Sequence, residues 1–136
     1  MSLSRTSNGN WKDELEALDL GQSTIDMTWS PELRSLFRTT ILTEGIDLQV
    51  LTAAEEAGEY NKACIRILSR PWQPDENFHR LVDETADLRI MLAQMEQIIA
   101  EIGPANWPET LQERIRFKAD RLRHRILAAH TIQVED

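Results

Sequence analysis

Five carboxylates in two short motifs are the residues of this chain best suited to do chemistry. The segment EEAGE supplies three of them and the segment ETAD supplies two, in the order Glu55, Glu56, Glu59, Glu84 and Asp87. Acids three or four positions apart lie one turn apart on one face of a helix. Two such helices packed side by side would gather four or five carboxylates around one point. Because carboxylate oxygens suit Mg²⁺ or Mn²⁺ and repel one another without a cation, the two motifs predict a metal site.

The surroundings of the motifs favour a metal site over a solvated acidic face. In a helical chain with 23 acidic residues, either motif alone is more commonly part of a solvated face. Small residues, Ala54, Ala57 and Gly58, flank the first motif and allow another helix to approach. The second motif borders an apolar seam, where crowded carboxylates need a cation or basic side chains to offset their repulsion.

The elements that must position these acids are predicted to be helices. Few glycines and prolines, with many Leu, Ala, Glu and Arg residues, predict an all-α fold. Ser30-Pro31 is a helix start, and Pro71 and Gly103-Pro104 force helices to end. We therefore expect four helices, at about residues 30–39, 45–69, 75–102 and 106–129.

The apolar spacing predicts which face of each long helix points inward. In the helix at about 45–69, the inward residues are predicted to be Leu48, Leu51, Ala54, Ala57, Cys64, Ile65 and Leu68. In the helix at about 75–102, they are predicted to be Phe78, Leu81, Thr85, Leu88, Leu92, Met95, Ile99 and Ile102. The pattern predicts a single α-helical bundle domain over residues 30–131, with a short tail at 132–136. Residues 1–29 are predicted to be a polar, flexible leader, in which Trp11 and Trp29 pack on the body or on a second subunit.

Composition and charge restrict the class of protein. The chain has 136 residues and a formal net charge of −8, which argues against general binding to nucleic acid or to an anionic membrane. The single cysteine excludes an intrachain disulfide and fits a reducing compartment. The N-terminus lacks a signal-peptide pattern, and no apolar run approaches the roughly 20 residues that span a bilayer. The sequence therefore predicts a soluble, cytoplasmic protein.

Two segments together resemble a known family. EEAGEYNKA and, after a long gap, LVDETADLRIMLAQME are similar to the paired EExxE and ExxD motifs of the MazG-like all-α nucleoside triphosphate pyrophosphohydrolases. The resemblance covers roughly residues 44–126, and FKADRLRHRI is similar to the basic last helix of phage-type members. It implies a four-helix-bundle-like MazG fold that forms a homodimer or homotetramer. It also implies cleavage of (d)NTPs between the α and β phosphates, giving monophosphate and pyrophosphate, as in nucleotide-pool housecleaning.

The resemblance assigns roles to individual residues. The positions of the family's Mg²⁺ ligands, for which Mn²⁺ can substitute, match Glu56, Glu59, Glu84 and Asp87. Glu55 matches the additional acid of the first motif, as a further ligand or to orient water. Lys62 matches a basic residue one turn beyond that motif, within reach of a phosphate. Tyr60, where a leucine is more usual, and Gly58 within the helix depart from the pattern and affect the base and sugar preference.

Three further residues are candidates for substrate binding. Lys118 and Arg121 lie one turn apart in a basic segment and can reach triphosphate oxygens, although a solvated basic face is the alternative. Asn77, near the start of a helix, can bond a sugar or base, with a role in the turn as the alternative.

Two other functions compete with the hydrolase. A helical interaction module without activity would carry the same helices but would need no intact set of acids. A di-iron oxidase is suggested by Glu76-x-x-His79, which is half of a carboxylate-bundle signature. That site needs a second copy of the motif, and the sequence has none.

Overall fold

The computed structural model describes residues 29–135, and side chains as far as residue 129. The described part is all-α, with four helices and no strand: α2 (Pro31–Glu44), α3 (Ile46–Ser69), α4 (Pro74–Ile102) and α5 (Trp107–Glu135). The predicted all-α fold and its four helices are therefore confirmed. The predicted leader, apart from Trp29, lies outside the described residues, as does Trp11. None of the described helices is long and apolar enough to cross a membrane.

The helix ends follow the predicted signals with two differences in extent. The Ser30 hydroxyl accepts a hydrogen bond from the Leu33 amide at 3.2 Å and caps α2. That helix continues past residue 39 to Glu44 and stops at Gly45, whose φ of 89° favours glycine. At the other end of the chain, α5 continues past residue 129 to Glu135.

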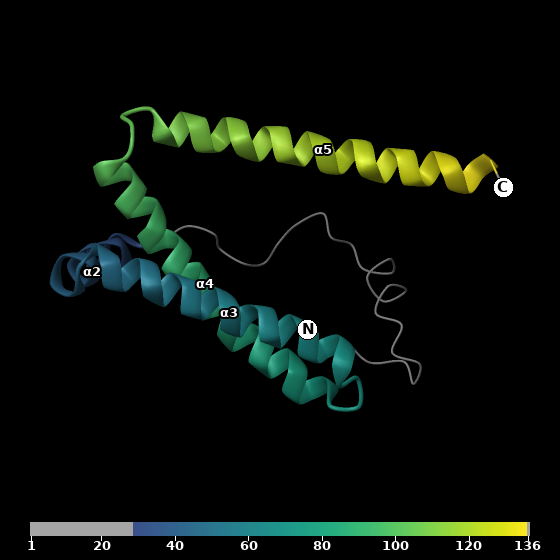
Figure 1. The fold of residues 1–136 in the computed structure, drawn as a ribbon, viewed down its shortest axis with the longest axis horizontal. Helices are drawn as coiled ribbons and strands as arrows, with labels where there is room; N and C mark the ends of the chain where they lie inside the picture. The colour runs from purple at the N-terminus through teal and green to yellow at the C-terminus, as the bar shows by residue number, and fades with distance from the viewer. Residues whose placement is uncertain (1–28, 136) are drawn as a thin grey trace.

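Helices α3 and α4 form an antiparallel hairpin, joined by a short loop at residues 70–73 (Figure 1). Helix α2 packs on the C-terminal half of α4, where Arg38 forms an ion pair with Glu101 at 2.6 Å. The ring of Trp29 stacks edge-to-face on Phe37, with centroids 5.1 Å apart, so Trp29 packs on the body as predicted.

Helix α5 extends away from this hairpin (Figure 1). Within the described chain its backbone contacts only α4, near the corner that joins the two helices. Its residues from Gln112 to Ala129 are all exposed. The apolar side chains of Ile115, Phe117, Leu122 and Ile126 on α5 are therefore exposed in the described chain.

The predicted inward face of α3 is wrong within this chain except at Cys64, which is half-buried. Leu48, Leu51, Ile65 and Leu68 are 47%, 56%, 54% and 74% exposed, and Ala54 and Ala57 are also exposed. The residues that are buried or half-buried include Gln49, Glu56 and Ala63, on a different face. Helix α3 thus turns a partly polar face to α4 and leaves its apolar stripe uncovered. The prediction failed because apolar spacing shows which residues share a face but not which neighbour that face contacts.

The predicted seam of α4 is only partly covered. Leu81, Thr85, Leu88 and Met95 are half-buried, as expected for a packing face. Four other members of the seam are exposed, namely Phe78, Leu92, Ile99 and Ile102. The buried residues of α4 are instead Asn77, Met91, Ala93, Gln94 and Ile98. The contact surface of α4 is therefore rotated from the predicted seam.

Candidate metal centre

Three of the predicted acids come together between α3 and α4. Glu56 on α3 and Glu84 and Asp87 on α4 each offer a carboxylate oxygen, and these oxygens lie within 4.8 Å of one another. Glu56 and Glu84 are half-buried, whereas Asp87 is exposed. Three oxygen donors at this spacing can hold one hard divalent cation and leave positions for water and for a ligand.

The electrostatics of Glu56 reflect this crowding. Burial raises the pKa of Glu56 above its usual value, and the nearby Asp87 and Glu84 carboxylates raise it further, followed by Glu59 and Glu55. The neighbouring negative charges make the ionised form of Glu56 less favourable than in water. A divalent cation among these carboxylates would reverse the effect.

The other two predicted acids lie beside the cluster and outside it. Glu59 forms an ion pair with Lys62, at 3.2 Å from Oε1 to Nζ. Glu59, predicted to bind the metal ion, therefore pairs with Lys62, predicted to bind a phosphate. Both side chains are largely exposed and can separate at little cost. Glu55 is exposed.

A pocket of about 280 Å³ extends from the acids toward the α3–α4 loop. Glu59 and Glu84 line it at one end, and the remaining charged residues that line it are all basic: Lys62, Arg66, Arg70 and Arg80. An acidic cluster and a basic pocket are therefore contiguous, an arrangement that suits a ligand carrying both a cation and phosphate groups.

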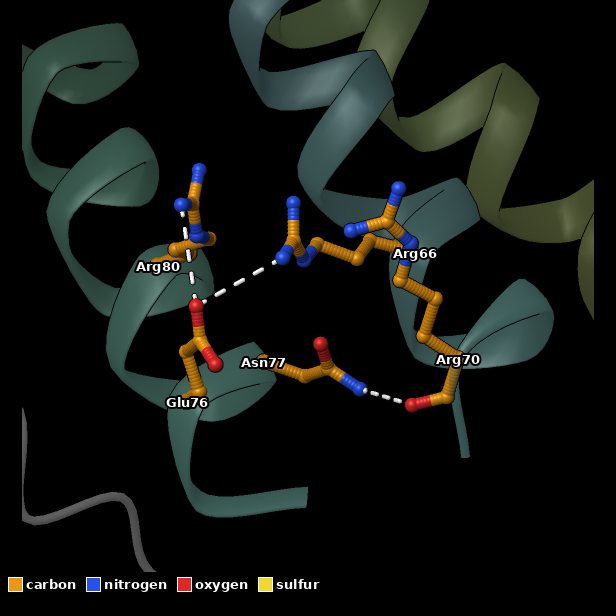
Figure 2. Close-up of polar contacts among 5 residues, drawn as sticks. All are labelled: Arg66, Arg70, Glu76, Asn77 and Arg80. Carbon is orange, nitrogen blue, oxygen red and sulfur yellow. Dashed lines mark hydrogen bonds and ion pairs between the residues drawn. The ribbon is translucent and has the colours of Figure 1, made fainter. Parts of the chain in front are cut away.

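Glu76 holds two arginines of this pocket loosely (Figure 2). One of its oxygens, Oε1, lies 3.5 Å from Arg66 Nη2 and 3.7 Å from Arg80 Nη2. Glu76 therefore pairs with arginines, and His79 belongs to no metal-binding group in the described chain. In the described chain, Glu76 therefore has a charge-pairing role with these two arginines.

Asn77 has a role in the turn. It is only 2% exposed, and its side-chain amide donates to the Arg70 carbonyl at 2.7 Å (Figure 2). This hydrogen bond ties the start of α4 to the loop at the end of α3. The structure thus favours the turn role over contact with a sugar or base.

Lys118 and Arg121 do not join the acids within one chain. Both side chains are exposed on α5, which makes no contact with α3 in the described chain. The predicted contact with a triphosphate would therefore require another chain.

The sequence analysis missed Arg66, Arg70 and Arg80. A signal was present, because Lys62, Arg66 and Arg70 recur every four residues and Arg80 precedes Glu84 by four. These spacings place each basic residue on the same helical face as an acid, one or more turns closer to the loop. The antiparallel pairing of α3 and α4 then brings the basic residues at the end of α3 close to Arg80 on α4.

Comparisons with known proteins give no match: no protein-family model, no curated protein and no solved structure is significantly similar to this chain.

Proposed function

We propose that the protein is a Mg²⁺-dependent nucleoside triphosphate pyrophosphohydrolase that acts on (d)NTPs of the cytoplasmic pool. The observation that carries the proposal is the convergence of Glu56, Glu84 and Asp87 from two helices, next to a basic pocket. The similarity of the EEAGE and ETAD segments to the MazG-like motifs points to the same chemistry. A bound cation would neutralise the carboxylates, and a bound polyphosphate would neutralise the basic pocket.

The residues present fit Mg²⁺. All three donors are carboxylate oxygens, which Mg²⁺ prefers, and the raised pKa of Glu56 marks repulsion that a cation would relieve. When bound, Mg²⁺ would offset charge on the phosphoryl oxygens and make a nearby water a better nucleophile. Mn²⁺, which takes similar ligands, is expected to substitute.

The proposed reaction is a single displacement by water. The water oxygen forms a bond to the α phosphorus, and the bond from that phosphorus to the bridging oxygen breaks. Pyrophosphate leaves with the bridging oxygen, and the proton of the water passes to solvent. No covalent intermediate is required, which suits a site composed of carboxylates and basic side chains.

The test is an incubation with each common ribo- and deoxyribonucleoside triphosphate, in Mg²⁺ and in EDTA. We expect monophosphate and pyrophosphate from at least one of them, only when Mg²⁺ is present. Release of diphosphate and single phosphate would instead indicate cleavage of the other anhydride bond, and would refute the proposed activity.

We also propose that the protein forms a homodimer or homotetramer through its exposed apolar faces. Leu51, Ile65 and Leu68 form an uncovered stripe on α3, and Ile115, Leu122 and Ile126 share one face of α5. Exposed large apolar side chains that share a helical face are candidates for an interface with another chain.

Charge complementarity supports a second copy as the partner. Between Arg114 and Arg125, α5 carries six basic residues and one acidic residue, Asp120. Helices α3 and α4 together carry eleven acidic and four basic residues. The α5 helix of one copy therefore complements the α3–α4 hairpin of another. Such packing would bring Lys118 and Arg121 close to a partner's acids.

A charged residue in the α3 stripe should disrupt this assembly. We expect the wild-type protein to have the mass of a dimer or tetramer in size-exclusion chromatography with light scattering. Leu51→Glu should shift the mass toward that of the monomer, because burial of a charge in an apolar interface is costly. Ser35→Glu, at an exposed position on α2, is the control and should keep the wild-type mass. A monomeric wild-type protein would contradict the proposed assembly.

The same exposed faces favour a second candidate function, a non-catalytic helical interaction module. In that case the apolar stripes of α3 and α5 would bind other proteins, and the carboxylates would be a solvated surface. The two functions differ in their response to Mg²⁺. A binding site stabilises the fold at low cation concentration by mass action, whereas a solvated surface responds only to ionic strength.

A further inference from the structure

The basic pocket at the loop end of the α3–α4 hairpin differs from an ordinary solvated face. Four of its charged lining residues are basic and two are acidic, in a chain with a net charge of −8. The basic residues come from both helices and from the loop position that follows α3. The pocket is therefore locally positive in a chain of negative net charge, which favours an anion.

Arg66 lines this pocket and has unused hydrogen-bonding capacity. Its side chain is 21% exposed, and its Nε is buried without a hydrogen-bond partner in the described chain. Its distance of 3.5 Å to Glu76 is longer than the roughly 2.7–2.9 Å of a good charged hydrogen bond. A buried guanidinium donor without a partner is costly, so a ligand that accepts from Arg66 would be stabilised.

Glu76 competes with such a ligand for the arginines. Among the described residues, it is the one carboxylate that forms ion pairs with both Arg66 and Arg80, and the long distances show that neither pair is tight (Figure 2). Glu76 is 51% exposed, so it can turn toward solvent when an anion arrives. The pocket thus carries positive charge before a ligand binds, and Glu76 neutralises that charge only weakly.

The position of the pocket fixes an orientation for a triphosphate. Glu84 belongs both to the carboxylate cluster and to the pocket, and Arg80 lies one helical turn from it toward the loop. Arg66 lies about two turns from Glu59, also toward the loop. An anion in the pocket would therefore continue directly from a phosphate held at the carboxylates.

We propose that this pocket binds the β and γ phosphates of the substrate and the pyrophosphate product, through Arg66 and Arg80, with Glu76 as the competing internal anion. The inference rests on the proposed function and specifies its substrate orientation. The α phosphate lies at the carboxylate cluster, and the nucleoside points away from the α3–α4 loop.

Calorimetric titration of inorganic pyrophosphate, in the presence of Mg²⁺, tests the pocket without chemistry. Arg66→Gln and Arg80→Gln should each weaken binding about ten- to a hundredfold, since each loses a charged hydrogen bond. Arg66→Lys should recover part of the loss. Glu76→Gln should strengthen binding severalfold, because it removes the competing charge. Arg38→Gln, at an exposed ion pair with Glu101 outside the pocket, should bind like the wild type.

Arg80 is 54% exposed, so its substitution leaves the fold intact and keeps the test decisive. Equal pyrophosphate binding by wild type, Arg66→Gln and Arg80→Gln would overturn the inference, as would weaker binding in Glu76→Gln. Failure of the proposed function gives a different result. The wild type would then bind pyrophosphate with the predicted arginine dependence, yet release none from any nucleoside triphosphate.

Discussion

Asp87→Asn is expected to lower kcat for triphosphate hydrolysis by on the order of a thousandfold, with the helical circular dichroism unchanged. Asp87 is one of three carboxylates whose oxygens lie within 4.8 Å of one another, and it is the exposed member of the three. The amide keeps the shape of the side chain but removes the charge that would hold the proposed cation. Loss of a metal that supplies several kcal/mol of charge stabilisation in the transition state gives an effect of this size.

Asp83→Asn is the matched control for this variant. Asp83 is an exposed aspartate on the same helix, one turn before Asp87 and outside the carboxylate cluster. Both substitutions remove one negative charge from α4, so a general electrostatic effect would lower both rates equally. We expect near wild-type turnover for Asp83→Asn. Comparable turnover by the two variants would exclude Asp87 from the site.

Glu56→Gln is expected to stabilise the protein without metal and to abolish its stabilisation by Mg²⁺. Neighbouring carboxylates and burial raise the pKa of Glu56, so its charge destabilises the folded state at neutral pH. For the wild type, Mg²⁺ at about a hundredfold excess over its Kd should raise Tm by on the order of 10 °C. Glu56→Gln should raise the Tm of the metal-free protein by a few degrees, to a value that Mg²⁺ barely changes.

The pH dependence of this stability has a definite sign. Because the folded-state pKa of Glu56 lies above the unfolded value, the folded state binds the proton more tightly. The resulting stabilisation is fully present below the unfolded pKa and is lost as pH rises through the raised pKa. Metal-free wild type should therefore gain stability from this group as pH falls through the raised pKa toward the unfolded value. The increment from Mg²⁺ should shrink over the same interval, because the cation must displace the proton.

Thermal melts with and without Mg²⁺, at several pH values, measure these effects. Glu55→Gln is the control, because Glu55 is the adjacent exposed acid and lies outside the cluster. Glu55→Gln should keep most of the rise in Tm that Mg²⁺ produces in the wild type. An increment that survives in Glu56→Gln, or one that NaCl of equal ionic strength reproduces in the wild type, would contradict a specific cation site.

The convergence of three carboxylates between α3 and α4 could be predicted from sequence because its information is local. EEAGE and ETAD each place acids on one helical face, and Pro71 together with the short loop requires the two helices to run antiparallel. Glu56, Glu84 and Asp87 then meet without any detailed knowledge of packing. Ser30-Pro31 and Gly103-Pro104 fixed helix ends for the same local reason.

The packing faces could not be predicted in this way. Leu51 and Ile65 share an apolar face of α3, and apolar spacing alone places such a face in the core of its own chain. In the structure that face is exposed, and Glu56 and Gln49 face the other helix instead. If a second copy covers the apolar face, the order of the helices along one chain cannot reveal that contact.

The basic pocket could be predicted from sequence only in part. The spacings of Arg66 and Arg80 are visible in the sequence, but their meeting depends on the register between α3 and α4. Asn77 helps to set that register through its hydrogen bond to the Arg70 carbonyl. Such a contact between a side chain and a backbone oxygen seven residues earlier in the chain has no periodic signature.

Hydrolysis of the preferred triphosphate in ¹⁸O-labelled water, followed by ³¹P nuclear magnetic resonance, tests the central claim most directly. The account predicts a monophosphate that carries the label, unlabelled pyrophosphate, and no reaction when EDTA replaces Mg²⁺. Label in the pyrophosphate would place the attack on the β phosphorus. Turnover that persists in EDTA, or triphosphates that all remain intact, would contradict a carboxylate-held cation as the basis of the activity.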